Sequence, residues 1–370
     1  MQPLLSKARL LSIELRKKLL KSDGLLAVSC AVSLIAVAIF ISWYNNKVVP
    51  LNADPTARYT LEPNNFLKFM SNWDGPNYIE LAKHGYTNIV QANFFPLYPL
   101  VIRLLRVVIG SPLVSALLVS WLSLIGSLYF YLKIIKHVFK LKVNAEALRC
   151  LIFFILFPTA IFLLATYTEG LLTFLALAAI YCGLKKHYLP AAVLVMLATA
   201  THITGLLVLV LVALILLEEG VKRSRVILGA AIGSLGLISY MYFLWRRFDR
   251  PLAFITSQED HGWLRPGFSR LASTIDLFNV VFIILLILTV IYWWNRRKSF
   301  AIYAFLFLMI PLIGRQFGGF NRYVLIAFPV QLMLYSYLRN KKLAYTFIIA
   351  FMAIIWTYFT LQYAGGYVGG

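Results

Sequence analysis

Long apolar stretches, separated by short polar and charged segments, recur along almost the entire chain of 370 residues. A helix needs about 20 mostly apolar residues to cross the hydrocarbon core of a bilayer. The pattern therefore predicts an all-α polytopic membrane protein, with one transmembrane domain over residues 1–370 and about eleven spanning helices. The predicted spans are 25–43, 113–134, 149–166, 169–184, 189–202, 203–217, 226–245, 276–294, 300–313, 324–338 and 343–361.

The fifth, sixth and ninth predicted spans are short for a membrane crossing. Residues 189–217 have an alternative interpretation as one long tilted helix, which would change the topology of everything that follows. The basic residues favour eleven spans, because that arrangement places 22 of the 35 Lys and Arg residues on one side. An excess of Lys and Arg marks the cytoplasmic side, so the basic segment 1–24 is predicted to be cytoplasmic.

The composition agrees with a membrane protein and excludes several function classes. Hydrophobic residues make up 61% of the chain and charged residues only 13%, which is not the balance of a water-soluble domain. The net charge of +21 follows from the topology, so we expect no nucleic-acid partner. The first span is predicted to be a retained signal anchor. Each of the three cysteines lies within a predicted span, which argues against a disulfide framework or a metal cluster.

The predicted external side carries two long segments, 44–112 and 246–275, and a short one, 314–323, and function is expected there. Of the 13 basic residues assigned to this side, 10 are Arg, whereas 14 of the 22 on the other side are Lys. Arginine presents a planar fork that matches two phosphate oxygens at once. The bias predicts phosphate binding on the external side. The alternative is that these arginines contact anionic lipid headgroups.

The first external loop contains the polar stretch "SNWDGPNYIELAKHGY", residues 71–86. Pro76 suits the first position of a helix and Gly85 the position just after its end. With apolar residues at helical spacing between them, the stretch predicts a short amphipathic helix over 76–84 that lies in the membrane interface. The segment "PLVIRLLRVVIG", residues 99–110, predicts a second interfacial helix.

Asp74 stands just before the N-terminus of the first of these helices. The helix dipole favours an ionised carboxylate there, and the neighbouring Trp73 is suited to anchor the loop in the interface. Local sequence leaves two interpretations of Asp74, a helix-capping residue and a catalytic carboxylate. The two roles are compatible.

Six segments in a fixed order carry a resemblance to a known family. They are "WDGPNYIELAKHGY", "FFPLYP", "FPTAIFLLATYTEGL", "ATATHITGL", "RFDRPLAFITSQEDHGW" and "FNRYVLIAFPV". In this order they resemble the PIG-V-like mannosyltransferases, which include mannosyltransferase II of glycosylphosphatidylinositol biosynthesis and bacterial and archaeal relatives. The resemblance covers roughly residues 72–330. The family belongs to the GT-C class of multi-span glycosyltransferases, whose sugar donor is a polyprenyl-phosphate sugar.

The resemblance implies a GT-C-type bundle whose first external loop carries the catalytic aspartate, here Asp74, beneath a roof of short interfacial helices. The family's Tyr-Thr-Glu stretch corresponds to Tyr167, Thr168 and Glu169, and its late Arg-Tyr pair corresponds to Arg322 and Tyr323.

One position departs from the family pattern. The family is expected to have an arginine where this chain has His202, which leaves the identity of the donor or of the sugar open. A lone histidine near a helix end is usually a hydrogen-bonded structural residue, and no ligand spacing supports a metal site.

The expected reaction is a single displacement with inversion. Breaking the bond between sugar and phosphate adds negative charge to the leaving phosphate, which preplaced cations stabilise in the transition state. The first candidates for these cations are Arg322 and Arg315, followed by Arg265 and Arg103. Asp74 is predicted to be the general base that takes the proton of the acceptor hydroxyl. This chemistry requires neither a metal nor a cofactor.

Other residues are candidates for contact with the sugar or the acceptor. A carboxylate at the outer end of a span, such as Glu169, either binds sugar hydroxyls or pairs with an external arginine. In the loop 246–275, Asp249, Gln258 and Trp263 either contact the sugar or acceptor or serve only the architecture of the loop. The loop is also a candidate lid over the site. The candidate residues for sugar and acceptor binding are Trp73, Tyr167, Glu169, His202, Asp249, Gln258, Trp263 and Tyr323.

The sequence therefore predicts an enzyme that moves a sugar, most simply mannose, from a polyprenyl-phosphate donor to a hydroxyl of a lipid-linked or cell-surface glycan. Its site would face the outside of a bacterial or archaeal plasma membrane, or the lumen of the endoplasmic reticulum in a eukaryote, among membrane lipids. A flippase for a lipid-linked saccharide and a noncatalytic membrane subunit are the alternatives, and the second predicts that Asp74 is dispensable. The sequence leaves the acceptor and the oligomeric state open.

Overall fold

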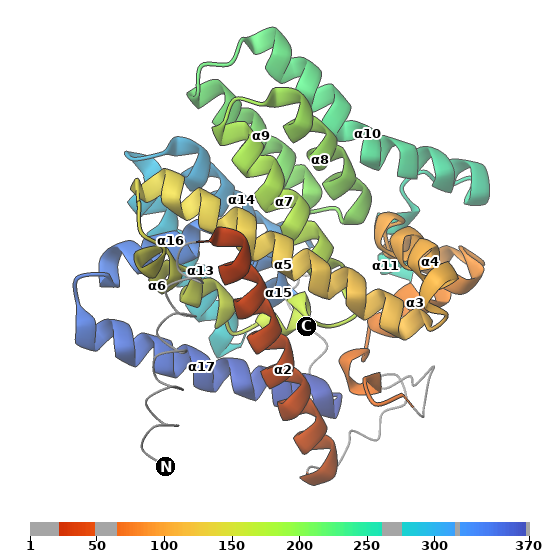
Figure 1. Ribbon diagram of the computed structural model, residues 1–370. Coiled ribbons are helices and arrows are strands. Elements are labelled where there is room, and N and C mark those ends of the chain that lie inside the picture. Colours follow the sequence, from red (N-terminus) through yellow and green to blue (C-terminus); the bar gives the residue numbers. More distant parts are fainter. Residues whose placement is uncertain (1–21, 49–64, 261–275, 315–318, 368–370) are drawn as a thin grey trace.

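The computed structural model describes residues 22–48, 65–260, 276–314 and 319–367. Within these ranges the secondary structure is helical throughout, with no strand (Figure 1). The prediction of an all-α architecture is confirmed for the described residues.

Five of the described helices are long and apolar enough to cross a membrane, and four shorter helices are strongly apolar. The chain is therefore a multi-pass helical membrane protein by length and composition, whereas the count of eleven spans remains a prediction. The five long helices are α2 (Asp23–Val48), α5 (Pro112–Phe139), α10 (Arg223–Phe248), α13 (Leu277–Trp294) and α17 (Lys342–Gly365). The four shorter ones are α7 (Thr168–Leu184), α8 (Tyr188–Thr201), α9 (Gly205–Glu218) and α14 (Lys298–Gly314).

Two of the predicted spans are interrupted. The segment 149–166 contains only the end of α6 (Asn144–Ile155) and then the short 3₁₀ helix η3 (Ala160–Leu163). Pro158 lies between them, and a proline both lacks an N–H donor and disfavours the helical conformation of the preceding residue. Prolines inside the "FPTAIF" and "AFPV" motifs thus break the chain into short helical pieces. The late pieces are α15 (Phe320–Val324) and α16 (Pro329–Leu338).

The region 189–217 forms two helices, so the interpretation as one long helix is wrong. The break falls at His202, whose backbone is extended between α8 and α9. A side chain at Gly205 would place its Cβ 2.5 Å from the carbonyl oxygen of Ala198, so the first turn of α9 packs directly against the last turn of α8. Only glycine permits this close approach.

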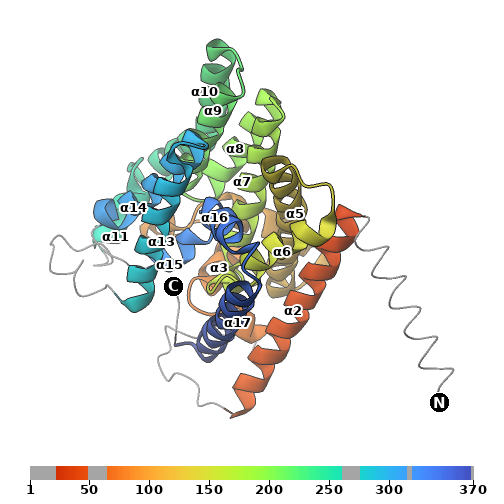
Figure 2. The same ribbon diagram turned by 90° about the vertical axis from the view of Figure 1, so that its left-hand side faces the viewer.

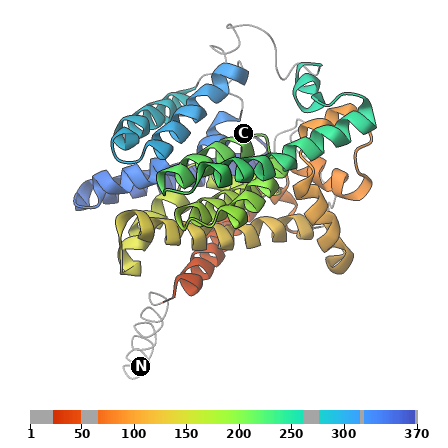
Figure 3. The same cartoon turned by 90° about the horizontal axis from the view of Figure 1, so that it is seen from above.

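The long helices pack side by side in an elongated bundle, and short helices gather at one end of it. α2 and α17 lie together at one edge and α8, α9 and α10 at the opposite edge, with α5 and α7 between them (Figures 1 and 2). The helices α3, α4 and α11 gather at one end of the bundle (Figure 3). Their bounds are Gly75–His84, Leu97–Ile109 and Ala253–Asp260. Both short helices predicted in the first loop are therefore present.

Ion pairs join helix ends at the end of the bundle opposite to α3, α4 and α11. Arg297, at the turn between α13 and α14, lies 3.2 Å from Glu218 and 2.7 Å from Glu219 at the end of α9. At the start of α2, Asp23 pairs with Lys133 at 2.9 Å and with Lys136. These helix ends are among those that the charge pattern assigns to the cytoplasm. Their grouping agrees with that assignment, and the orientation itself stays a prediction.

Candidate active site

The candidate catalytic residue Asp74 lies in a tightly packed turn at the start of α3. Trp73, immediately before it, has a left-handed backbone with φ of 56°, a conformation that costs free energy for a non-glycine residue. A Cβ at Gly75 would lie 2.1 Å from the Thr166 hydroxyl oxygen and 2.7 Å from that of Ser71. The hydroxyl of Thr166 donates to Ser71 at 2.8 Å. The turn is thus clamped between two hydroxyl side chains, and only glycine fits after the aspartate.

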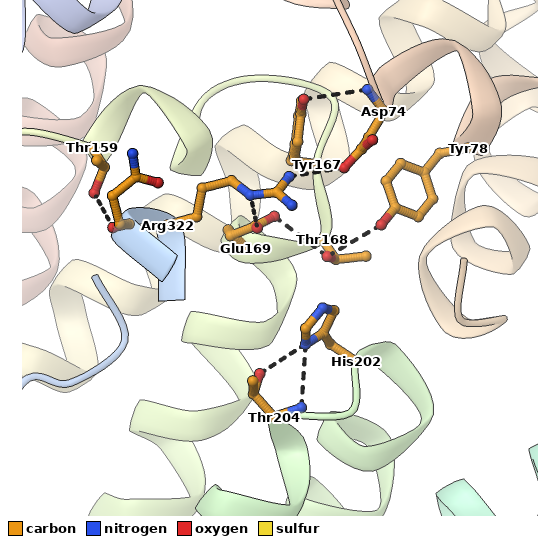
Figure 4. A network of polar contacts seen from close by, with 10 residues as sticks. Asp74, Tyr78, Thr159, Tyr167, Thr168, Glu169, His202, Thr204 and Arg322 are labelled. Atoms are coloured by element: carbon orange, nitrogen blue, oxygen red, sulfur yellow. Dashed lines mark hydrogen bonds and ion pairs between the residues drawn. The ribbon is translucent and has the colours of Figure 1, made fainter. Parts of the chain in front are cut away.

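The carboxylate of Asp74 does not cap the helix. Asp74 occupies the N-cap position, but its side chain accepts no hydrogen bond from the first turn of α3. Its Oδ2 instead accepts a hydrogen bond of 2.8 Å from Nη1 of Arg322 (Figure 4). The Asp74 side chain is 32% exposed, whereas that of Arg322 is 13% exposed. The capping interpretation is therefore wrong, and the carboxylate is accessible from one side while an arginine holds it from the other.

Arg322 lies at the centre of the cluster. Its Nε is 3.7 Å from Oε1 of Glu169, and its guanidinium lies 5.2 Å from the centre of the Tyr167 ring and 5.6 Å from that of Phe162. Burial alone would lower the pKa of Arg322, but the carboxylates of Glu169 and Asp74 outweigh it and hold the pKa well above its usual value. Arg322 is therefore a permanent cation between two carboxylates.

Glu169 is buried at the first turn of α7, with only 3% of its surface exposed. The Thr168 hydroxyl donates to its Oε2 at 3.4 Å, and Arg322 supplies the opposite charge. A buried carboxylate is tolerated when such partners are present. Of the two roles expected for Glu169, the structure shows the pairing with an arginine, and sugar contact stays a prediction.

Two tyrosine hydroxyls border the same carboxylates. The backbone N–H of Asp74 donates to the Tyr167 hydroxyl at 3.3 Å, and the Tyr78 hydroxyl lies 3.5 Å from Oγ1 of Thr168 (Figure 4). Burial raises the pKa of both tyrosines, and the negative charge of Asp74 raises it further. Both hydroxyls therefore keep their protons and can donate hydrogen bonds.

Comparison with known proteins connects this geometry to chemistry. A search of curated proteins found no match. A family model described as Mannosyltransferase (PIG-V) matches residues 44–221. Over these residues, just under half of the chain, the protein is similar to the PIG-V mannosyltransferase family. The matched region contains Asp74, Tyr167 and Glu169, and the resemblance seen in the sequence is confirmed. The match supports a glycosyltransferase of the mannosyltransferase type.

The matched region 44–221 also contains His202, whose contacts in the structure are local. Its Nδ1 accepts the backbone N–H of Thr204 at 3.2 Å and lies 2.8 Å from the Thr204 hydroxyl oxygen. The ring packs against Tyr323 at 5.3 Å and Phe95 at 6.2 Å between ring centres. These contacts order the break between α8 and α9, which agrees with the structural interpretation of this histidine. Within the described residues, no group of three or more His, Cys, Asp and Glu side chains could hold a metal ion.

Arg103 lies apart from the Asp74 cluster. Its Nε donates to the carbonyl of Ala82 at 2.8 Å and its Nη2 to that of Leu81 at 3.2 Å. These carbonyls belong to the last turn of α3, whereas Asp74 precedes the first turn. The helix between them rises by about 15 Å. The structure therefore does not bring Arg103 together with Arg322, with which it was expected to share a phosphate.

The remaining predicted residues lie at different places. Tyr323 is adjacent to the cluster, with its ring centre 5.7 Å from the Arg322 guanidinium. Asp249 ends α10 in a left-handed conformation, and Gln258 is part of α11, where the structure describes the backbone alone. The predicted residues that lie outside the described part of the chain are Trp263, Arg265 and Arg315.

The end of α17 anchors the turn that carries Asp74, which the sequence did not predict. The backbone N–H of Asn72 donates to the Tyr363 hydroxyl at 3.1 Å, and the Asn72 side chain donates to the Tyr363 carbonyl at 2.7 Å. The Tyr363 hydroxyl in turn donates to the carbonyl of Met70 at 3.3 Å. Asn72 belongs to a quoted motif, whereas Tyr363 sits in a span with no local feature that marks it. Tyr363 therefore holds the turn that precedes Asp74, which predicts a positioning role for its hydroxyl.

Replacing Tyr363 with Phe tests this positioning role. The variant keeps the ring and loses the hydroxyl that holds the backbone on both sides of Ser71, so we expect kcat to fall roughly ten- to a hundredfold through misplacement of Asp74, with a loss of about 1 kcal/mol in unfolding free energy. Transfer kinetics and thermal unfolding of the purified protein measure the two effects. Tyr358, which is 46% exposed on the same helix, gives the matched control Tyr358→Phe. Equal kcat in both variants would remove Tyr363 from the positioning role.

Proposed function

We propose that this protein is an inverting GT-C-type glycosyltransferase that moves mannose from a polyprenyl-phosphate donor to a hydroxyl of a lipid-linked or cell-surface glycan. The observation that carries the proposal is the hydrogen bond of 2.8 Å between Asp74 and Arg322. It joins a candidate base and a candidate phosphate ligand in one cluster, and a displacement at a sugar phosphate needs both groups. The similarity of residues 44–221 to the mannosyltransferase family supports the choice of sugar.

In the proposed reaction, the acceptor hydroxyl lies against the exposed side of Asp74. Its oxygen attacks the anomeric carbon while its proton passes to the carboxylate, and the bond between the anomeric carbon and the phosphate oxygen breaks. The products are a glycoside of inverted configuration and a polyprenyl phosphate with one additional negative charge. No oxidant, reductant or further reactant is needed.

Arg322 connects the two halves of this reaction. The negative charge that Asp74 loses on protonation reappears on the leaving phosphate, so one guanidinium within reach of both stabilises the displacement throughout. The Nε of Arg322 is buried 3.7 Å from Oε1 of Glu169, so contact with a substrate oxygen is proposed for the other edge of the guanidinium, which also holds Asp74. Glu169 keeps the cluster at a net charge of −1 before substrate binds. Further cations are therefore expected at the phosphate, for which Arg315 and Arg265 remain the proposed candidates.

The site is proposed to face the external or lumenal side, as the distribution of basic residues indicates. The flippase alternative gains no support from the described residues, whose cluster of charged side chains lies where the first turns of α3 and α7 meet α15 (Figure 4). Transporters commonly place such groups near the middle of the membrane between repeated halves.

A reconstitution experiment tests the function. The purified protein is incubated in vesicles with a panel of polyprenyl-phosphate sugars and a membrane lipid extract, and products are identified by mass spectrometry and by the anomeric coupling in proton spectra. We expect a new hexose on a lipid acceptor, with polyprenyl-phosphate mannose as the best donor and an inverted anomeric centre. Movement of a lipid-linked sugar across the vesicle without a new glycosidic bond would instead establish a flippase.

A further inference from the structure

A cavity lies between α3, α4, α8 and α10, and its lining residues do not include Asp74, Glu169 or Arg322. It has a volume of about 580 Å³ and is bounded by the last turn of α3, by α4 and by the halves of α8 and α10 nearest the site. We call this cavity the α8–α10 slot. Its walls are mainly aliphatic and aromatic, and the polar groups among them include two arginines, Arg103 and Arg247.

The slot has the dimensions and orientation of a site for a lipid chain. Its wall follows α10 from Leu235 to Arg247, a rise of about 18 Å, which is more than half of the roughly 30 Å hydrocarbon core of a bilayer. α10 is 26 residues long, or about 39 Å, so its terminal residues, including Arg247, reach the headgroup level. Leu235 and Phe243 are 45% and 39% exposed, so the wall of the slot is open to the surroundings along its length. The apolar end therefore lies within the bilayer and the arginine end at its surface.

The two arginines converge on one short segment of backbone. Arg103 donates to the carbonyls of Leu81 and Ala82, and Arg247 donates to that of Tyr86 through Nε at 3.3 Å and Nη2 at 3.2 Å. Within the described part of the chain, neither forms an ion pair with a carboxylate. Two guanidiniums at the end of an apolar slot, with their charges uncompensated, match an anionic phosphate on a hydrocarbon chain.

An aromatic wall separates the slot from Arg322. Tyr240 lines the slot and packs on Phe95 at 4.8 Å, Phe95 packs on His202 at 6.2 Å, and His202 packs on Tyr323 at 5.3 Å between ring centres. The Tyr240 hydroxyl fixes this wall by donating to the carbonyl of Ala92 at 2.8 Å. These rings lie between the slot and Arg322, so a phosphate at the arginine end of the slot occupies a different place from one at Arg322.

The distance between Asp74 and the arginine end of the slot also argues against binding of the donor phosphate there. If Asp74 is the base, the acceptor oxygen lies about 3 Å from its carboxylate and the anomeric carbon about 3 Å further. The arginine end of the slot lies at the other end of α3, about 15 Å from Asp74 along the helix axis. This distance of about 15 Å is too long for the phosphate of the donor, which is bonded directly to the anomeric carbon. It suits an acceptor whose polar head extends along α3.

We propose that the α8–α10 slot binds the hydrocarbon chain of the acceptor, which is a phosphate-bearing lipid. Arg103 and Arg247 hold its phosphate, and its hydroxyl-bearing head lies along α3 and reaches Asp74. That the bound lipid is the acceptor rests on the proposed function. That the slot binds a lipid phosphate rests on the slot alone. The donor phosphate and the acceptor phosphate then occupy different arginine sites on the two sides of the aromatic wall.

A binding measurement tests the slot independently of catalysis. Ser239 lines the slot, whereas the adjacent Ile238, 51% exposed, does not, so Ser239→Trp fills the slot and Ile238→Trp is its matched control. We expect dioctanoyl phosphatidic acid to bind the detergent-purified protein and the control equally, and the Ser239→Trp variant at least tenfold more weakly, by calorimetry. Dioctanoylglycerol, which lacks the phosphate, should bind the unmodified protein at least tenfold more weakly. Equal binding to both tryptophan variants, or equal binding of the two lipids, would overturn the site.

A kinetic measurement tests which substrate the slot serves. With polyprenyl-phosphate mannose as donor and the membrane lipid extract as acceptor, Ser239→Trp should raise the KM for acceptor lipid at least tenfold and leave the KM for donor within twofold. A raised donor KM with an unchanged acceptor KM would assign the slot to the donor and overturn the inference. If the unmodified protein transfers no sugar in the reconstitution experiment, the proposed function fails, while the binding measurement still decides whether the slot takes a lipid phosphate.

Discussion

Replacing Asp74 with Asn is expected to lower kcat by roughly 10² to 10⁴ while the protein remains folded. The amide keeps the shape of the side chain but cannot accept the acceptor's proton, and general bases contribute a factor of that size. Folding should survive, because Arg322 keeps the buried Glu169 as a partner at 3.7 Å and the Asp74 side chain is already 32% exposed. The measurement is transfer of radiolabelled mannose to the lipid extract, together with thermal unfolding.

The control for this variant lies on the same short helix. Glu80 pairs with Lys83 at 3.4 Å on the outer side of α3, so Glu80→Gln removes one carboxylate from the helix without approaching Arg322. We expect its transfer rate to stay within a factor of two of the unmodified protein. Transfer by the Asp74→Asn variant at the rate of this control would show that Asp74 is dispensable, as the noncatalytic-subunit alternative requires.

Replacing Arg322 with Gln is expected to reduce both stability and activity. Loss of the guanidinium leaves Glu169, whose side chain is 4% exposed, without its cation, and breaking a buried ion pair in this way costs about 3–5 kcal/mol. Activity should fall by at least about 10² in kcat, the size of effect seen when one group that stabilises developing charge is removed. Unfolding experiments and transfer kinetics measure the two losses separately.

A double variant separates the structural from the catalytic part of this effect. Changing both Arg322 and Glu169 to Gln removes the stranded charge, so the double variant should regain most of the stability that Arg322→Gln loses. Activity should stay low, because no cation remains beside the leaving phosphate. Recovery of transfer along with stability would mean that Arg322 serves only to neutralise Glu169 and has no part in the reaction.

The elements that could be predicted from sequence are those with a local cause. The short helix 76–84 follows from a proline at its start and a glycine after its end, and the structure places it within α3. The apolar runs identify the helices of the bundle because a bilayer requires backbone hydrogen bonds to be satisfied within each spanning segment. The ends of the predicted spans 149–166 and 324–338 were less well predicted, because Pro158 and Pro329 lie inside apolar runs that hydropathy alone does not divide.

The candidate site shows the same division. Asp74, Glu169 and Arg322 could each be chosen from sequence, since each is a charged residue near the end of an apolar run and each lies in a segment that resembles the family. The sequence could not predict the contacts among them. Asp74 and Arg322 are separated by 248 in sequence, and no local pattern sets a distance across a bundle. For the same reason the sequence predicts Arg103 beside Arg322, which the structure contradicts, and no local feature of the sequence points to Tyr363.

The sequence by itself determined that this protein is a helical membrane protein related to the mannosyltransferases, because hydropathy, the distribution of basic residues and short motifs are local properties of the chain. Only the tertiary structure decided that Asp74 holds Arg322 and does not cap its helix, and that Arg103 faces a lipid-sized slot together with Arg247. Each of those outcomes depends on which helix ends contact each other. The packing of the whole bundle determines these contacts, and no single segment of the sequence specifies them.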